Sequence, residues 1–194
     1  MKSPKKRDDE KVWNIPNSLT LLRVVITFVV MYMIFADFSV ILIVILFSIG
    51  MITDFLDGQI ARRFKQTTEF GRKFDMIADR FLFIGTLIAI IVDFSIQGIL
   101  GKYYMLQIFM LMAREVLSLP MALIVLTAGK GIPKARNIGK LTTVLQGVAF
   151  PAVLLGIYYP VFGFSIYLAG LTAVVGAISA VYYIHDAFKL GRQK

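Results

Sequence analysis

Six apolar segments, each about 20 residues long, dominate this chain of 194 residues. A helix needs about 20 apolar residues to cross the hydrocarbon core of a bilayer. The composition is 58% hydrophobic and 17% charged, whereas soluble domains are about 45–50% apolar and about 25% charged. A soluble globular domain is therefore excluded, and we expect an all-α polytopic membrane protein with six transmembrane helices in one bundle. The expected spans are Leu19–Phe35, Phe38–Asp57, Phe74–Phe94, Tyr103–Leu126, Gly139–Tyr159 and Phe164–Phe188.

The bundle is expected to form one domain, residues 19–188, with a short cytoplasmic tail at 189–194. Residues 1–18 are polar and basic, and they include Trp13, Ile15 and Pro16. Trp is enriched at membrane interfaces, so we expect a short interfacial helix in this segment before the first span.

Basic residues are distributed unevenly between the two sides of the predicted bundle. Seventeen of the 21 Lys and Arg residues lie in the two tails and in the loops after the second and fourth spans, while Lys102 alone lies on the other side. The remaining three, Arg23, Arg80 and Arg114, fall within spans. The positive-inside rule then predicts a multi-pass cell-membrane protein with both termini in the cytoplasm. The dispersed charge fits contact with anionic membrane lipids, and nucleic acid is not expected as a partner.

Four aspartates gather at the cytoplasmic ends of the second and third spans. Asp54 and Asp57 are three residues apart, and Asp75 and Asp79 are four apart. Residues at these spacings lie on one face of a helix. A hairpin of the two helices would bring the four carboxylates together. Because ionisable groups in spans are costly, such a cluster indicates a functional site.

The residues around these aspartates indicate what the cluster could bind. Oxygen ligands without His or Cys favour hard ions such as Mg²⁺, Mn²⁺ or Ca²⁺, and two carboxylate-bridged ions commonly assist displacement at phosphorus. Gly58 and Ala61 continue the first stripe and Gly71 begins the second, which leaves room for a bulky polar substrate. An alternative is that the aspartates form interfacial ion pairs with nearby arginines: Arg62, Arg63, Arg72 and Arg80.

The full pattern Asp54-x2-Asp57-Gly58-x2-Ala61-Arg62-x8-Gly71-x3-Asp75-x3-Asp79 resembles the defining motif of the CDP-alcohol phosphatidyltransferase family at every fixed position and gap. The chain length, the six spans and an opening segment from Asn14 to Arg23 resemble that family as well. The resemblance thus covers essentially the whole chain.

The resemblance implies an enzyme that transfers a phosphatidyl group from CDP-diacylglycerol, or an equivalent group from a CDP-linked ether lipid, to a small polar alcohol with release of CMP. It implies that Asp54, Asp57, Asp75 and Asp79 hold Mg²⁺ or Mn²⁺, two ions per site, and that Asp79 is the catalytic base. It also implies a homodimer with cytoplasm-facing active sites. The CDP-lipid contacts that it implies are Asp54, Asp57, Gly58, Ala61, Arg62, Gly71 and Asp75.

The acceptor alcohol is suggested by basic residues in and after the fourth span. Arg114, Lys134, Arg136 and Lys140 could bind a phosphorylated acceptor, because Arg and Lys are natural partners of phosphate. The alternatives are an intramembrane ion pair of Arg114 with Glu115 and, for the loop residues, simple membrane topology.

The segments around Arg114 and Lys140 resemble bacterial phosphatidylglycerophosphate synthases, whose acceptor is glycerol 3-phosphate. Thr142 departs from that resemblance, because those enzymes commonly carry a Lys there. Inositol phosphate and serine therefore stay open as acceptors.

Two other classes could use intramembrane carboxylates. A membrane prenyltransferase needs about nine spans and two separated Asp-rich motifs, whereas this chain has six expected spans and one continuous motif. A divalent-cation transporter would place carboxylates near the midplane on broken helices with repeat symmetry, and no repeat is evident here. Both are weaker interpretations than the phosphatidyltransferase.

Overall fold

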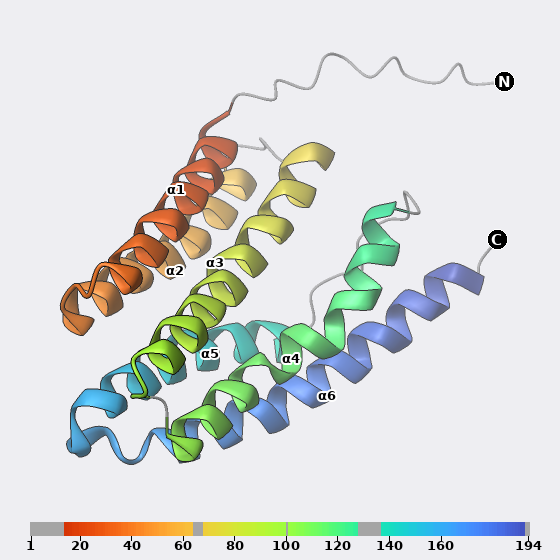
Figure 1. The fold of residues 1–194 in the computed structure, drawn as a ribbon. Coiled ribbons are helices and arrows are strands. Elements are labelled where there is room, and N and C mark those ends of the chain that lie inside the picture. The colour runs from red at the N-terminus through yellow and green to blue at the C-terminus, as the bar shows by residue number, and fades with distance from the viewer. Residues whose placement is uncertain (1–13, 64–67, 100, 128–136, 193–194) are drawn as a thin grey trace, which may run out of the picture.

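The computed structural model describes residues 14–63, 68–99, 101–127 and 137–192. Within these ranges the chain forms six α-helices and one short 3-10 helix, with no strand, which confirms the all-α prediction (Figure 1). The elements are α1 (Ile15–Phe35), α2 (Val40–Arg63), α3 (Glu69–Ile96), α4 (Lys102–Thr127), α5 (Asn137–Tyr158), η1 (Pro160–Phe162) and α6 (Ser165–Arg192).

Helix α1 begins earlier than the apolar window predicts. The Asn14 side chain accepts a hydrogen bond from the backbone N–H of Asn17 at 2.9 Å, and Pro16 stands in the first turn. A capping Asn and an early Pro both favour a helix start at this point. Ile15 and Pro16 therefore belong to α1 itself and form no separate interfacial helix, while Trp13 lies outside the described residues.

Helices α2 and α3 extend past their apolar windows at the end that carries the aspartates. Helix α2 ends at Arg63, beyond the expected Asp57, and α3 begins at Glu69, before the expected Phe74. Thr68 caps α3 by accepting a hydrogen bond from the backbone N–H of Gly71 at 2.9 Å. The polar turns continue the helices, because capping and the backbone ladder do not depend on hydrophobicity.

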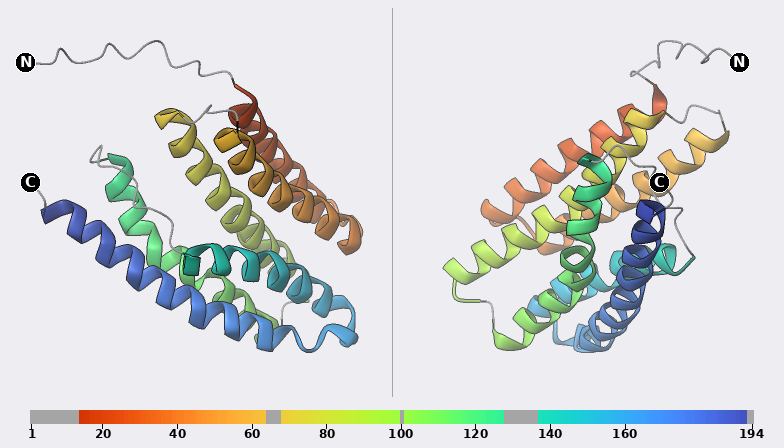
Figure 2. Two further views of the ribbon diagram at one scale, coloured as in Figure 1. Left: turned by 180° about the vertical axis from the view of Figure 1, so that it is seen from behind. Right: turned by 90° about the vertical axis from the view of Figure 1, so that its right-hand side faces the viewer.

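The helices form two groups joined through α5. Helix α1 packs against both α2 and α3, and α4 packs against α6. Helix α5 packs on α6 and also contacts α2. Figures 1 and 2 show it as a helix that crosses below α1, α2 and α3. The start of α1, the end of α2, the start of α3 and the end of α6 lie toward the same end of the molecule (Figure 1).

The two groups meet at an aromatic cluster in the middle of the protein. The Phe47 ring of α2 lies 4.0 Å from the Phe150 ring of α5, centroid to centroid, and Phe83 of α3 lies 5.8 Å from Phe150. Phe47 and Phe150 are fully buried. Such pairs add about 0.5–1.5 kcal/mol beyond their buried area. The cluster therefore fixes α5 against the helices that carry the aspartates.

Polar and apolar residues are distributed as expected for a protein in a membrane. The surface exposes large apolar side chains such as Phe28, Val144 and Tyr167, whereas Arg23 and Gln107 are fully buried. In the described part of the chain, three segments are long and apolar enough to cross a membrane: Ile15–Phe35, Ile138–Tyr158 and Pro160–Tyr182. These features are those of a membrane protein, and the count of six spans stays a prediction.

Candidate metal and substrate site

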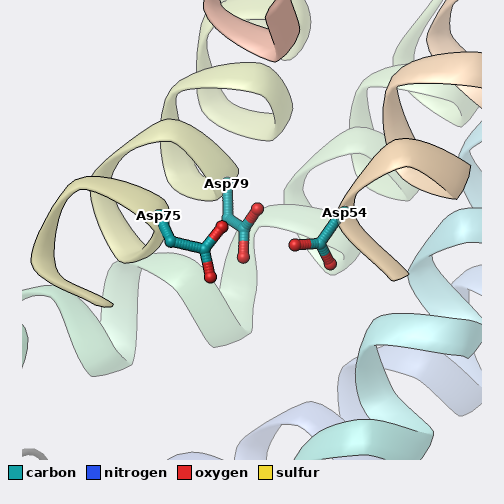
Figure 3. Close-up of side chains that lie close together, drawn as sticks. All are labelled: Asp54, Asp75 and Asp79. Carbon is teal, nitrogen blue, oxygen red and sulfur yellow. The ribbon is translucent and has the colours of Figure 1, made fainter. Parts of the chain in front are cut away.

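Three of the four predicted aspartates come together where α2 ends and α3 begins. Asp75 and Asp79 project from successive turns of α3 toward Asp54 on α2 (Figure 3). One carboxylate oxygen from each residue lies within 4.8 Å of the other two. The side chains of Asp54, Asp75 and Asp79 are 23%, 37% and 42% exposed. A small ion or a polar substrate could therefore reach the cluster.

A fourth side chain completes this cluster from α1. The guanidinium of Arg23 donates hydrogen bonds through Nη1 to Oδ1 of Asp75 at 2.9 Å and to Oδ1 of Asp79 at 2.6 Å. Its Nη2 lies 3.2 Å from Oδ1 of Asp54. The Arg23 side chain has 0% exposure. We define these four residues as the Arg23–aspartate cluster.

The sequence places Arg23 inside a span, and its pattern predicts no role for this residue in the site. The alternative of arginine pairing involves Arg62, Arg63, Arg72 and Arg80, all near the aspartates in the sequence. Among the described side chains, a cation that pairs with Asp54, Asp75 and Asp79 comes from α1, while the side chains of Arg62, Arg63 and Arg72 lie outside the described part of the structure. A charged residue within a span always demands a partner, and that signal could have found Arg23.

The charges of the cluster decide whether a cation fits. Three ionised carboxylates against one guanidinium leave two negative charges on the described side chains. Poorly solvated carboxylates in excess are costly unless a cation compensates them. Carboxylate oxygens are the ligands that Mg²⁺ and Mn²⁺ prefer. The donor set, the remaining charge and the partial exposure therefore fit a divalent metal ion.

The other residues of the motif are only partly described. Asp57, Gly58, Ala61 and Arg62 lie in the last turns of α2, and their side chains lie outside the described part of the structure. Their places in the site stay predictions.

Gly71 is buried in the first turn of α3, where α3 meets α1. A Cβ atom there would collide with Oδ1 of Asn17 and would come within 2.9 Å of Oγ1 of Thr68. Glycine thus allows the close approach of α1 to α3, and a larger residue would displace the side chains of Asn17 and Thr68. This packing role is separate from the CDP-lipid contact implied by the resemblance.

The predicted acceptor residues are only partly visible. Lys134 and Arg136 lie outside the described residues, and of Arg114 only the helical backbone is described. Lys140 is exposed near the start of α5. The acceptor set therefore stays a prediction.

Glu115 forms a second buried polar connection near the site. Its Oε2 lies 3.7 Å from Nη1 of Arg80 on α3, and its Oε1 accepts a hydrogen bond from Nε2 of Gln146 on α5 at 3.3 Å. The sequence offers Arg114 as a partner of Glu115, but the Arg114 side chain lies outside the described part of the structure, so that pair stays a prediction beside the observed contact with Arg80. Since Arg80 directly follows Asp79, this contact ties the aspartate-bearing turn of α3 to α4 and α5.

Comparison with known proteins agrees with this geometry. The model of the family described as CDP-alcohol phosphatidyltransferase matches residues 13–182. A CDP-diacylglycerol–glycerol-3-phosphate 3-phosphatidyltransferase of Rickettsia typhi is 31% identical over 145 residues, which cover 74% of this chain and 77% of the relative. The enzyme of the same name from Sodalis glossinidius is 30% identical over 183 residues, covering 91% and 98%. A Drosophila melanogaster protein named "Probable cardiolipin synthase (CMP-forming)" is 28% identical over 209 residues, covering 97% and 63%.

Proposed function

Because this chain belongs to the CDP-alcohol phosphatidyltransferase family, it is a phosphatidyltransferase enzyme of phospholipid biosynthesis, and we propose that its acceptor is glycerol 3-phosphate. In this proposal the phosphatidyl group of CDP-diacylglycerol passes to the acceptor hydroxyl and CMP is released. The observation that carries the proposal is the Arg23–aspartate cluster, whose excess negative charge suits a divalent ion. The names of the relatives from Rickettsia and Sodalis support the choice of donor and acceptor.

The metal ligands in this proposal are Asp54, Asp57, Asp75 and Asp79. Mg²⁺ or Mn²⁺ bound there, two ions per site, would neutralise the diphosphate and make the phosphorus more electrophilic. Asp54 and the α3 aspartates approach from different helices, so the packing of α2 and α3 on α1 sets the spacing of the ligands. Arg23 holds one oxygen of each described carboxylate.

Asp79 is the proposed general base. It is the most exposed aspartate of the cluster, which suits contact with a second substrate. Its carboxylate would take the proton of the acceptor hydroxyl as the hydroxyl oxygen forms a bond to phosphorus. The bond between that phosphorus and the bridging oxygen of CMP breaks, and CMP leaves with the electron pair. Positioned proton transfer of this kind contributes about 10²–10⁴-fold to a rate.

The remaining contacts of the two substrates follow from the motif. We assign the CDP moiety to the aspartates together with Gly58, Ala61, Arg62 and Gly71. We assign the phosphate of the acceptor to the basic residues that lie after the third helix in the chain: Arg114, Lys134, Arg136 and Lys140.

The proposed setting is a cell membrane crossed several times, with both termini and the active site at the cytoplasmic face. Two observations support this orientation. The aspartates lie near the start of α3, at the end of the molecule where α1 begins and α6 ends (Figure 1), and the basic tails and loops of the sequence alternate with the helices so as to share that side. A homodimer, which the family resemblance implies, belongs to the same proposal and is checked by the mass of the detergent-solubilised protein.

A second acceptor is worth testing for a specific reason. The Drosophila relative with the cardiolipin synthase name aligns with 97% of this chain. Cardiolipin formation with release of CMP uses phosphatidylglycerol as the alcohol, so this lipid is the second candidate acceptor.

A direct assay separates the candidates. The purified protein in liposomes receives CDP-diacylglycerol, Mg²⁺ or Mn²⁺, and one acceptor at a time from glycerol 3-phosphate, phosphatidylglycerol, inositol phosphate and serine. We expect CMP release and a new lipid by mass spectrometry with glycerol 3-phosphate. A product with another acceptor alone would overturn the proposed acceptor, and no CMP release with any of them would overturn the proposed reaction.

A further inference from the structure

Arg23 is the largest side chain among the fully buried residues of the described structure. Its helix neighbours on the same face, Thr20 and Thr27, are also buried, and each donates its hydroxyl hydrogen bond to a backbone carbonyl of α1. Burying a guanidinium is costly unless acidic partners compensate it. The three aspartates provide that compensation, and Arg23 in turn compensates part of their mutual repulsion.

We propose that Arg23 is a positioning residue and built-in counter-ion of the metal site, which holds the three aspartates together in the metal-free protein and limits the affinity of the site for divalent ions. This inference rests on the proposed function, because it takes the aspartates to be metal ligands. Helix α1 carries no residue of the aspartate motif. In this inference it nevertheless sets the net charge of the metal site through Arg23.

The hydrogen-bond geometry supports the positioning part of the proposal. One guanidinium nitrogen, Nη1, is shared by Asp75 and Asp79, and the other, Nη2, faces Asp54. Helices α2 and α3 pack on α1 more extensively than on each other. The fork of Arg23 is therefore a direct polar connection between the two ligand-bearing helices. A planar fork can span two partners in this way, whereas a Lys ammonium acts as a point charge.

The charges predict the direction in which loss of Arg23 changes the stability of the fold and the affinity for a divalent ion. In the metal-free protein, loss of the Arg23 charge leaves three close carboxylates that repel one another with no compensating cation from α1, so the fold should become less stable. Toward an incoming divalent ion the guanidinium is a like charge, so its loss should tighten ion binding. Even screened as in water, a unit charge at contact distances from a divalent ion changes its affinity about tenfold or more. A residue that only filled space would change stability without this change in affinity.

The test compares Arg23→Met, which removes the charge, with Arg23→Lys, which keeps it. Thermal unfolding of the purified full chain in detergent is followed by circular dichroism, and Mn²⁺ binding is followed by the electron paramagnetic resonance signal of free Mn²⁺. In chelator we expect Arg23→Met to unfold at least about 3 °C below the wild type. Its Mn²⁺ midpoint should fall about tenfold or more, while Arg23→Lys keeps a midpoint within about threefold of the wild type.

Two further variants complete the design. Lys102→Met removes an exposed cation at the start of α4, away from the aspartates, so it should leave the Mn²⁺ midpoint unchanged. The double variant Arg23→Met/Asp54→Asn restores the original charge balance of the described cluster. We expect it to unfold in chelator at a higher temperature than Arg23→Met alone, which is the opposite of what two independent losses of packing would produce.

The outcomes separate this inference from the proposed function. A wild type that binds no Mn²⁺ would overturn the proposed metal site and the inference together. A wild type that binds Mn²⁺, with an unchanged or weaker midpoint in Arg23→Met, would overturn only the inference. If Arg23→Met and the double variant both fail to fold even in saturating Mn²⁺, Arg23 is a packing residue and the inference is wrong.

Discussion

The α1–α3 group carries a carboxylate cluster at each end, and the two clusters are built differently. At one end a fully buried guanidinium bridges Asp54, Asp75 and Asp79. At the other end, about 21 Å along α3 from Asp79 to Asp93 at the helical rise, the Gln97 amide donates to Oδ1 of Asp37 at 2.7 Å and to Oδ2 of Asp93 at 2.8 Å. At one end a neutral, exposed amide bridges the carboxylates, and at the other end a buried cation bridges them.

The difference shows which end gathers more carboxylates in one place. Asp37 follows α1 in a tight turn with a φ of 52°, and Gln97 fastens that turn to the end of α3. One amide is sufficient there, since Asp37 and Gln97 are exposed and only Asp93 is buried. A buried guanidinium is a more costly partner than an amide. Its presence beside three aspartates is explained if those carboxylates must stay ionised and close together for a metal ion.

The largest expected effect contrasts Asp79 with Asp93. Asp79→Asn removes the proposed base, so we expect turnover to fall about 10²–10⁴-fold while CDP-diacylglycerol binding is largely kept. Asp93→Asn changes a carboxylate of similar size on the same helix, far from the cluster, and should keep turnover near the wild-type value. CMP release and equilibrium binding of the donor measure the two quantities. Loss of donor binding with normal Mn²⁺ binding in Asp79→Asn would contradict its role as base.

The next effect concerns metal affinity. Asp54→Asn removes one of the three described side chains that we propose as metal ligands, and with it one negative charge, so we expect the Mn²⁺ midpoint to rise about tenfold or more. Asp37→Asn removes a carboxylate at the opposite end, and its midpoint should match the wild type. Both are read from the signal of free Mn²⁺. Equal midpoints in all three proteins would place the metal elsewhere.

Much of the Arg23–aspartate cluster could be predicted from the sequence, because the aspartates on each helix are only a few residues apart. Asp75 and Asp79 are four residues apart on one helix, and that spacing alone puts them on one face. The apolar windows also located the helices, although they missed the polar last turns of α2 and the polar first turn of α3, which the Thr68 cap supports. Local spacing and hydropathy therefore account for most of the fold and for the acidic part of the site.

Arg23 could not be assigned in the same way. It lies 52 residues before Asp75 and 56 before Asp79, so no local spacing links it to them, although the buried polar stripe of Asn17, Thr20, Arg23 and Thr27 marks one face of α1. Helix α1 is apolar around most of its circumference, because its outer face is also apolar, with Val25, Phe28 and Tyr32 exposed. In a membrane protein the hydrophobic pattern therefore does not mark the buried face, and tertiary packing decides the partner.

A smaller effect tests the packing that brings α1 to the cluster. Gly71→Ala places a Cβ against Oδ1 of Asn17 and Oγ1 of Thr68, and overpacking of this kind costs about 1–3 kcal/mol. Gly101 precedes α4 near the opposite end, and a Cβ atom added there would have no neighbour within 4 Å, so Gly101→Ala is the matched control. Thermal unfolding should show a lower midpoint for Gly71→Ala only. If Gly71→Ala unfolds like the wild type, α1 and α3 are less closely packed at this point.

The smallest effect concerns the amide at the far end. Gln97→Ala removes the donor shared by exposed Asp37 and buried Asp93. Because Gln97 is itself exposed, its loss opens Asp93 to water, so the cost should be about 0.5–1.5 kcal/mol, a typical value for one hydrogen-bonded side chain. Turnover and the Mn²⁺ midpoint should not change, because the amide lies at the opposite end of α3 from Asp79. Thermal unfolding and CMP release provide the two readouts. If Gln97→Ala lowered turnover as strongly as it lowered stability, the two ends would be coupled through α3. The contrast between the Arg23–aspartate cluster and the hydrogen bonds of Gln97 to Asp37 and Asp93 would then no longer hold.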